Sequence, residues 1–301
     1  MQPIRKVFVT GGTGFVGRAV IQALRGEGCG VRCLVRRGSE RDLQGLGAIE
    51  RVEGDVMAPQ TLDEGMAGCD AVIHLVGIIR EQPSIGATFE RVHTQGTVNV
   101  LDAAIAAGVR RYVHMSALGT RAESRSRYHR TKWLAEEAVR TSALPWTIFR
   151  PSIIYGRGDQ FVTMLADLIE RYPAVPVLGT GLQRLQPIPV AQVAAGFAHA
   201  LSRPATVKQA YTMAGPDAVT MLELLDRIGH AKGRRHVRKI HVPLGVVRSL
   251  AGLMHRFPGF PVTPDQLLML EEENVGDAQP FFSAFDLTPV PLNNGLRDML
   301  G

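Results

Sequence analysis

A phenol and an ammonium group lie four residues apart in the sequence, at Tyr128 and Lys132. Residues at this spacing share one face of a helix, and an ammonium beside a phenol favours the phenolate and lowers the pKa of the phenol. Such a pair suits a proton donor or acceptor that works together with hydride transfer. Ser116 ends a predicted strand, where its hydroxyl could orient a substrate carbonyl toward the tyrosine. Because a Tyr/Lys pair also occurs by chance on exposed helices, its meaning depends on the surrounding elements.

A glycine-rich turn supplies that context. It reads Thr10-Gly11-Gly12-Thr13-Gly14-Phe15-Val16-Gly17 and stands between a predicted strand and a predicted helix. Glycines at such a turn let backbone N–H groups approach a pyrophosphate, and the helix N-terminus adds the positive end of its dipole. The turn therefore predicts dinucleotide binding. The expected contacts are Gly11, Thr13, Gly14, Phe15, Val16 and Gly17.

Two arginines favour one nicotinamide dinucleotide over the other. In NAD-binding domains an acidic residue about 20 positions after the glycines holds the ribose 2′-hydroxyl, but this chain has Arg36 and Arg37 at that point. Guanidinium groups can bind a 2′-phosphate in a bidentate manner. We therefore expect NADP as cofactor, with NADPH preferred over NADH. The alternative is an ordinary solvated basic loop.

Two further segments are predicted to line the cofactor. Asp55 and Val56 follow the third strand, where the carboxylate could accept a hydrogen bond from an adenine amino group; the alternative is an ordinary turn aspartate. After the fourth strand, Leu75, Val76 and Gly77 would pass beneath the cofactor with little side-chain bulk.

Strands and helices alternate through the first half of the chain. Short apolar runs predict strands at 7–9, 31–35, 71–76 and 112–115, and helical spacing of apolar residues predicts helices at 15–24 and 89–107. This alternation predicts an α/β fold with a parallel sheet covered on both faces. Past residue 150, prolines separate predicted helices at 161–171 and 190–201. We expect a nucleotide-binding domain at 1–155, joined again by elements near 177–215, and a smaller substrate-side lobe at 156–176 and 216–301.

The composition excludes several classes of protein. The 301 residues are 45% hydrophobic and 21% charged, as in soluble globular proteins and unlike disordered chains or collagen. No run approaches the roughly 18 apolar residues of a membrane-spanning helix, and the first residues lack the pattern of a signal peptide. These features predict a cytoplasmic protein. The net charge of +6 is too modest to imply nucleic-acid binding.

Cysteine and histidine give no indication of a metal site. Three cysteines are too few for a disulfide framework, and we expect free thiols and no metal. His74 lies in a predicted buried strand and is expected to be a hydrogen-bonded core residue. The segment 232–255 is basic and then amphipathic. It is interpreted as a helix capping the substrate cleft, with a peripheral membrane or partner-binding helix as the alternative.

Together these motifs resemble the short-chain dehydrogenase/reductase superfamily, in its atypical, extended branch. The resemblance rests on the glycine turn, Gly54-Asp55-Val56, Met115 to Gly119, Tyr128 to Lys132, Trp146 to Ser152 and Leu185 to Pro187. Within that superfamily it is similar to the NAD(P)-binding accessory subunits of respiratory complex I and to their bacterial, epimerase/dehydratase-like relatives. The resemblance implies a Rossmann-type, doubly wound parallel sheet with a smaller C-terminal substrate lobe.

The resemblance also implies roles for individual residues. Tyr128 would be the acid/base, Lys132 would bind the nicotinamide ribose and tune the tyrosine, and Ser116 would position the substrate. Gly11, Gly14 and the amides of Phe15 and Val16 would hold the pyrophosphate, and the backbone from Pro151 to Ile153 would face the nicotinamide. His93 stands where the family commonly has an asparagine that supports a proton relay.

Several functions stay open at this point. The first is an NADP(H)-dependent oxidoreductase for a carbonyl or quinone-like small molecule, and the second is an accessory or assembly protein of a membrane respiratory complex that holds NADPH as a structural or redox-sensing group. A redox-sensing regulator is disfavoured because such relatives typically lack the Tyr/Lys pair. A nucleotide-sugar epimerase or dehydratase is disfavoured because residues 188–193 read Ile-Pro-Val-Ala-Gln-Val, whereas epimerases often read Val-His-Val-Asp-Asp-Val. The sequence leaves the oligomeric state open.

Overall fold

The computed structural model describes residues 3–39, 43–245, 247 and 263–301. The chain divides into two compact units. Unit 1 comprises Met1–Pro151, Val190–Met213 and Gln279–Leu287, and unit 2 comprises Ser152–Pro189, Ala214–Ala278 and Thr288–Gly301. Of the elements expected near 177–215 in the nucleotide-binding domain, 190–213 belong to unit 1 and 177–189 to unit 2.

Unit 1 is built on a seven-stranded parallel sheet with the strand order β11-β6-β5-β4-β1-β2-β3. The strands are β1 (Lys6–Thr10), β2 (Gly30–Val35), β3 (Glu50–Glu53), β4 (Ala71–His74), β5 (Arg111–Met115), β6 (Trp146–Pro151) and β11 (Gln209–Met213). The chain builds outward from β1 to β3 and then returns to place β4 on the other side of β1. The carboxyl ends of β1 and β4 therefore form the switch point at which open α/β sheets bind ligands.

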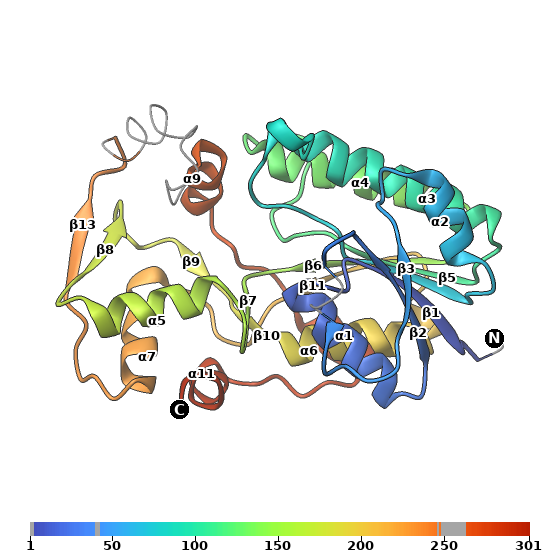
Figure 1. The fold of residues 1–301 in the computed structure, drawn as a ribbon. Coiled ribbons are helices and arrows are strands. Elements are labelled where there is room, and N and C mark those ends of the chain that lie inside the picture. Colours follow the sequence, from blue (N-terminus) through green and yellow to red (C-terminus); the bar gives the residue numbers. More distant parts are fainter. Residues whose placement is uncertain (1–2, 40–42, 246, 248–262) are drawn as a thin grey trace. The chain divides into compact units, whose positions relative to one another are not determined.

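Helices cover both faces of this sheet, as Figure 1 shows. On one face lie α2 (Pro59–Met66), α3 (Gly96–Ala106) and α4 (Arg127–Thr141), and on the other lie α1 (Phe15–Gly26) and α6 (Val190–Ala200). A short helix, α10 (Gln279–Phe285), packs against α6 and β11. Both faces of the central strands are consequently buried, which explains why β1 and β4 are apolar almost without interruption.

The predicted elements of unit 1 are confirmed apart from one helix. The helix expected over 89–107 is divided into a π-helical turn, Glu90–Gln95, and α3, which begins at Gly96. The helix α4 begins where the Ser126 side chain accepts a hydrogen bond from the backbone N–H of His129 at 3.3 Å. This cap fixes the start of the helix at Arg127, one residue before Tyr128.

Unit 2 has its own core, formed by helices and short strand pairs. Its elements are β7 (Ile154–Tyr155), α5 (Phe161–Arg171), β8 (Val175–Leu178), β9 (Arg184–Leu185), β10 (Ile188–Pro189), β12 (Val219–Thr220), α7 (Met221–Ala231), β13 (Lys239–Val242), α9 (Pro264–Glu271) and α11 (Leu292–Leu300). Buried side chains of α5, α7 and α11 form one cluster with Tyr155. A capping box between Thr220 and Glu223 starts α7.

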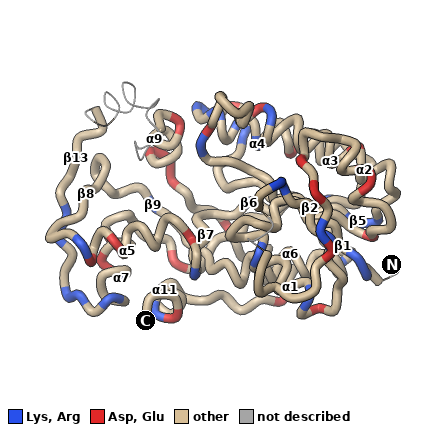
Figure 2. The backbone as a smooth tube through the Cα atoms, viewed as in Figure 1, with Lys and Arg blue, Asp and Glu red and all other residues tan. Residues whose placement is uncertain are grey.

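The basic part of the segment 232–255 lies between α7 and β13, where Figure 2 shows Lys and Arg close together along the backbone. Two of these cations are paired within unit 2, Lys232 with Glu170 and Lys239 with Asp226. Most of the amphipathic helix expected after them, at 246 and 248–262, lies outside the described residues. Across the described part of the chain, no helix is long and apolar enough to cross a bilayer.

Candidate active site

The glycine turn joins β1 to α1 at the switch point of the sheet. Gly11 has φ +74°, and a Cβ there would lie 3.1 Å from the backbone of Leu75 and Val76. A Cβ on Gly17 would lie closer still to the Gly11 carbonyl oxygen and to Gly12. These glycines are therefore required by the close approach of β1, α1 and the segment after β4.

Gly14 differs from the other glycines of the turn. A Cβ at this position would meet only the Gly11 oxygen, at 3.4 Å, so packing within the chain does not require glycine here. Gly14 caps α1 without a side-chain hydrogen bond, and the first turn of the helix carries no acidic residue. Among the residues that the structure describes, the N–H groups of Phe15 and Val16 have no side-chain acceptor at the positive end of the helix dipole. This opening fits a pyrophosphate, so the residues present suit the expected dinucleotide.

Arg36 and Arg37 follow β2 directly, and both are exposed. In the described part of the chain, neither guanidinium group is seen in an ion pair, and a turn with Ser39 N donating to Arg36 O holds their backbone. Asp55, after β3, is half-buried, and its Oδ1 accepts from Met57 N at 2.9 Å, which makes it a turn residue. The other carboxylate oxygen is the one that could accept from an adenine.

The segment after β4 runs from buried Leu75 through half-buried Val76 to exposed Gly77. Leu75 N donates to Thr10 O at 3.1 Å, which holds this segment against the glycine turn. Val56 is buried, and its carbonyl accepts from Asn99 Nδ2. These residues supply a surface of backbone and small apolar side chains beside the turn.

Lys132 is a buried cation at the centre of α4. Its Nζ donates to Met115 O at 3.1 Å and to Val76 O at 3.4 Å, and its side chain is only 2% exposed. Burial lowers the pKa of Lys132 to about 8, partly opposed by the carboxylate of Glu136 one turn further on. The ammonium therefore links α4 to the ends of both β4 and β5.

Tyr128 lies one turn before Lys132 and is half-buried among aromatic rings. Its ring meets Phe89 and His93 edge-on, at centroid distances of 5.8 and 5.2 Å. Burial raises the pKa of Tyr128 to about 12, so the lowering expected from the nearby lysine is not what the structure gives. The phenol is consequently protonated at neutral pH, in the state of a proton donor.

Ser116 directly follows β5 and is 3% exposed. Its Oγ is 3.4 Å from Thr120 Oγ1, and its N–H donates to Phe149 O. The residue before it, Met115, provides the carbonyl that Lys132 contacts. One strand end therefore carries both the serine and the anchor of the lysine.

His93 lies in the π-helical turn and uses both ring nitrogens. Nδ1 is 2.9 Å from Thr131 Oγ1, and Nε2 is 3.1 Å from Ile78 N and 3.0 Å from Ile78 O. Burial, with Lys132 as a further cause, lowers the pKa of His93 to about 2, so the ring is neutral. The ring therefore joins the segment after β4 to α4.

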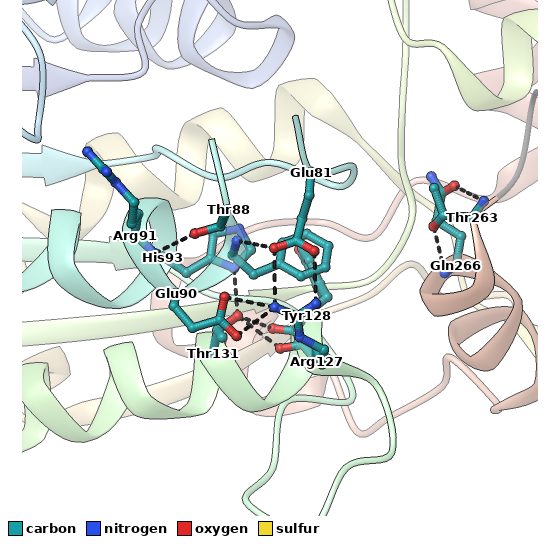
Figure 3. Close-up of polar contacts among 11 residues, drawn as sticks. Glu81, Thr88, Glu90, Arg91, His93, Arg127, Tyr128, Thr131, Thr263 and Gln266 are labelled. Carbon is teal, nitrogen blue, oxygen red and sulfur yellow. Dashed lines mark hydrogen bonds and ion pairs between the residues drawn. The ribbon is translucent and has the colours of Figure 1, made fainter. Parts of the chain in front are cut away.

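A second link between the segment after β4 and α4 was not expected from the sequence. Arg127 donates to Glu81 at 3.0 Å and to both oxygens of Glu90 at 2.9 and 3.0 Å, as Figure 3 shows. Glu81 also accepts from Phe89 N. This link flanks Tyr128, and it could not be found from spacing because its residues come from three separate segments.

Pro151 ends β6 and is buried, with its carbonyl accepting from Leu118 N at 2.9 Å. Ile153 belongs to unit 2, where its carbonyl accepts from Ile188 N. The roles expected for these two residues at the nicotinamide, like those of the other site residues, stay predictions.

Comparison with known proteins identifies the family. The sequence model of the NAD dependent epimerase/dehydratase family matches residues 7–214. The chain belongs to this family. The resemblance to the short-chain dehydrogenase/reductase superfamily and the Rossmann-type doubly wound sheet are thereby confirmed, and family membership establishes a nicotinamide dinucleotide as the class of cofactor.

Individual relatives of this epimerase/dehydratase family member cover most of its length. It is 32% identical over 262 residues to a ceramide reductase of Caulobacter vibrioides, covering 86% of this chain and 80% of the relative. It is 30% identical over 300 residues to an Arabidopsis thaliana NADH dehydrogenase [ubiquinone] 1 alpha subcomplex subunit 9, covering 93% and 73%. The structure of MoeE5 in complex with UDP-glucuronic acid and NAD superposes with a TM-score of 0.75 at 20% identity, covering 98% and 97%, which shows a shared fold.

Proposed function

We propose that this protein is an NADPH-dependent reductase for a carbonyl or quinone-like substrate, with Tyr128 as the proton donor. The observation that carries the proposal is the arrangement on α4, where a protonated phenol lies one turn from a buried ammonium tied to the strand end that bears Ser116. The similarity to a ceramide reductase and to a ketoreductase of Stigmatella aurantiaca supports reduction of a carbonyl.

The nicotinamide, when bound, would supply the hydride that adds to the carbonyl carbon. Tyr128 would donate its proton to the carbonyl oxygen, because its pKa of about 12 keeps it protonated until the oxygen gains negative charge. Lys132 would stabilise the resulting phenolate through its positive charge. Ser116 would hold the carbonyl oxygen by a hydrogen bond. His93 has both nitrogens engaged, so we place no proton-transfer step on its ring.

Arg36 and Arg37 are proposed to bind the 2′-phosphate of NADPH. They are exposed, adjacent and positioned directly after β2, and charge-assisted bidentate contacts to phosphate are the strongest hydrogen bonds that arginine makes. An aspartate or glutamate, which would favour NADH, is absent from both positions.

A second function is favoured by one observation, the 30% identity to an alpha subcomplex subunit 9 over 93% of this chain. In that case the protein would associate with a membrane respiratory complex and hold NADPH as a structural or redox-sensing group. A cytoplasmic or membrane-peripheral location is proposed together with these two functions.

The proposal is tested by purifying the protein, identifying by mass the nucleotide it releases on denaturation, and measuring NADPH oxidation with carbonyl and quinone substrates. A reductase should turn over, and Tyr128→Phe should lower kcat by about 100-fold or more. Tyr172→Phe removes an exposed hydroxyl of unit 2 and serves as the matched control. Stoichiometric, slowly exchanging NADPH without turnover would favour the accessory function, and an unchanged rate in Tyr128→Phe would contradict the mechanism.

A further inference from the structure

A chain of buried hydroxyl and imidazole groups starts at the residue before the glycine turn. Thr10 Oγ1 is 2.6 Å from His74 Nδ1, and His74 Nε2 is 3.1 Å from Thr97 Oγ1. Thr97 Oγ1 in turn is 2.6 Å from the backbone oxygen of His93. Thr10, His74, Thr97 and His93 are each at most 1% exposed. The expectation that His74 is a hydrogen-bonded core residue is thus confirmed.

The directions of these hydrogen bonds fix the tautomer of His74. The hydroxyl of Thr97 has one proton, which it donates to His93 O, so it must accept from His74 Nε2–H. His74 Nδ1 is then the acceptor for the hydroxyl proton of Thr10. Burial lowers the pKa of His74 to about 3, which agrees with a neutral ring.

His93 extends this set of contacts to α4. Its Nε2 lies 3.1 Å from Ile78 N and 3.0 Å from Ile78 O, so the ring can accept from the one or donate to the other, and these contacts fit either neutral tautomer. Nδ1 is 2.9 Å from Thr131 Oγ1, whose hydroxyl is 3.0 Å from the backbone oxygens of both Arg127 and Tyr128. Figure 3 shows His93 and Thr131 side by side next to Tyr128.

We propose that His74 is a positioning residue, fixed in one neutral tautomer, through which the strand end before the glycine turn is mechanically coupled to the π-helical turn whose His93 ring packs against Tyr128. Three hydrogen bonds in series make the connection, from Thr10 to His74, from His74 to Thr97 and from Thr97 to the backbone oxygen of His93, so a change of the His74 tautomer must change its bonds to both threonines. The role in catalysis rests on the proposed reductase activity, because the connection would give the cofactor turn and the proton donor a common support.

The first experiment measures the tautomers directly by long-range 1H–15N correlation on ligand-free protein labelled at histidine. His74 should show the proton on Nε2 at pH 7, and His74→Phe and His93→Phe variants assign the signals of the two rings. The opposite tautomer, a mixture or a charged ring at His74 would overturn the proposal. This measurement needs neither cofactor nor substrate.

The second experiment breaks the chain away from the proposed catalytic and cofactor-contacting side chains. Thr97→Val keeps the side-chain shape but removes the middle hydroxyl, and it should make the His74 tautomers mixed. Thr10→Val should move the 15N shifts of His93 through the intact chain, and Thr97→Val should abolish that response. Thr141→Val, near the exposed end of α4, is the matched control and should leave both rings unchanged. Unaltered His93 shifts in Thr10→Val would refute the coupling.

The link to catalysis is tested separately in the holoenzyme. Thr97→Val should lower kcat about tenfold while the KM for NADPH changes less than about threefold, since it touches no proposed cofactor contact. A kcat equal to that of the wild type would overturn the positioning role. A protein with the expected His74 tautomer and coupling but without nucleotide binding or turnover would retain the histidine chain and refute the proposed function instead.

Discussion

The ammonium of Lys132 and the backbone oxygen of Met115 lie 3.1 Å apart, which ties the middle of α4 to the end of β5. Because Ser116 follows Met115 directly, the position of the lysine and that of the serine depend on each other. The ammonium is almost fully buried. Any group that displaces it would therefore disturb the proposed acid and the proposed substrate anchor together.

Gly77→Ala should disturb this arrangement without changing any charge. A Cβ at Gly77 would lie 3.0 Å from Lys132 Nζ and 3.6 Å from His93 Nε2, so the ammonium must shift and weaken its bond to Met115 O. We expect kcat to fall about tenfold or more, since acid catalysis depends on geometry. Steady-state kinetics measure this effect. Gly26→Ala, where a Cβ would meet nothing within 4 Å, is the control, and equal rates in the two variants would contradict the expectation.

The two arginines after β2 predict a selective effect on nucleotide binding. Replacing Arg36 and Arg37 by alanine should raise the Kd for NADPH by roughly 10- to 100-fold, because hydrogen bonds to charged groups contribute about 1.5–3 kcal/mol. The Kd for NADH should change little, since it has no 2′-phosphate. Arg51→Ala removes an exposed charge from neighbouring β3 and is the control for long-range electrostatics. Equal weakening of both nucleotides would show that the arginines do not read the phosphate.

The local features of this fold follow from the sequence. The glycine turn, the apolar strands and the helix α5, which occupies the predicted range 161–171, depend on periodicity and on turn chemistry. The Tyr128 and Lys132 pair on one helix face depends only on spacing. These are properties of segments of about a dozen residues.

Tertiary contacts decide what the sequence could not show. The π-helical turn at Glu90–Gln95 has no hydrophobic period of its own, and the bonds of His93 to Ile78 and Thr131 come from segments 15 and 38 residues away. The pKa of Tyr128 is likewise decided by the rings that enclose it, which outweigh the lysine one turn away. The spacing of residues along the chain does not show which side chains will bury Tyr128.

Replacing Arg111, at the opposite end of β5, should strongly lower the stability of the protein. Its side chain is fully buried, and it donates to Ala200 O, Pro145 O, Thr147 Oγ1 and Thr206 Oγ1 at 2.6–2.9 Å. Arg111→Ala would remove all four of these buried hydrogen bonds, and of the four acceptors Pro145 O would keep Tyr112 N as a donor, so the free energy of unfolding should fall by about 3 kcal/mol or more. Urea denaturation measures the change. Arg110→Ala, which removes a partly exposed ion pair with Asp70, should lower the free energy of unfolding by about 1 kcal/mol or less. Similar losses in both variants would contradict the large stabilising role given to the hydrogen bonds of Arg111.

Two buried histidines predict that the folded state loses stability in mild acid. The pKa of His74 is lowered to about 3 and that of His93 to about 2, in both cases mainly by burial. Between these values and about 6.5 the unfolded chain binds a proton at each position and the folded chain does not, so stability must rise with pH. From pH 7 to pH 5 each histidine should lower the free energy of unfolding by about 2 kcal/mol.

Urea denaturation at pH 7 and pH 5 tests this dependence in a range where ordinary carboxylates stay ionised. In His74→Phe the difference between the two pH values should shrink by about 2 kcal/mol, whatever the substitution does to stability at pH 7. His236→Phe is the matched control, because that ring is exposed and stays solvated in both states. If His74→Phe kept the full difference between pH 7 and pH 5, His74 would have to accept a proton in the folded protein. The neutral ring between Thr10 and Thr97 would then be wrong.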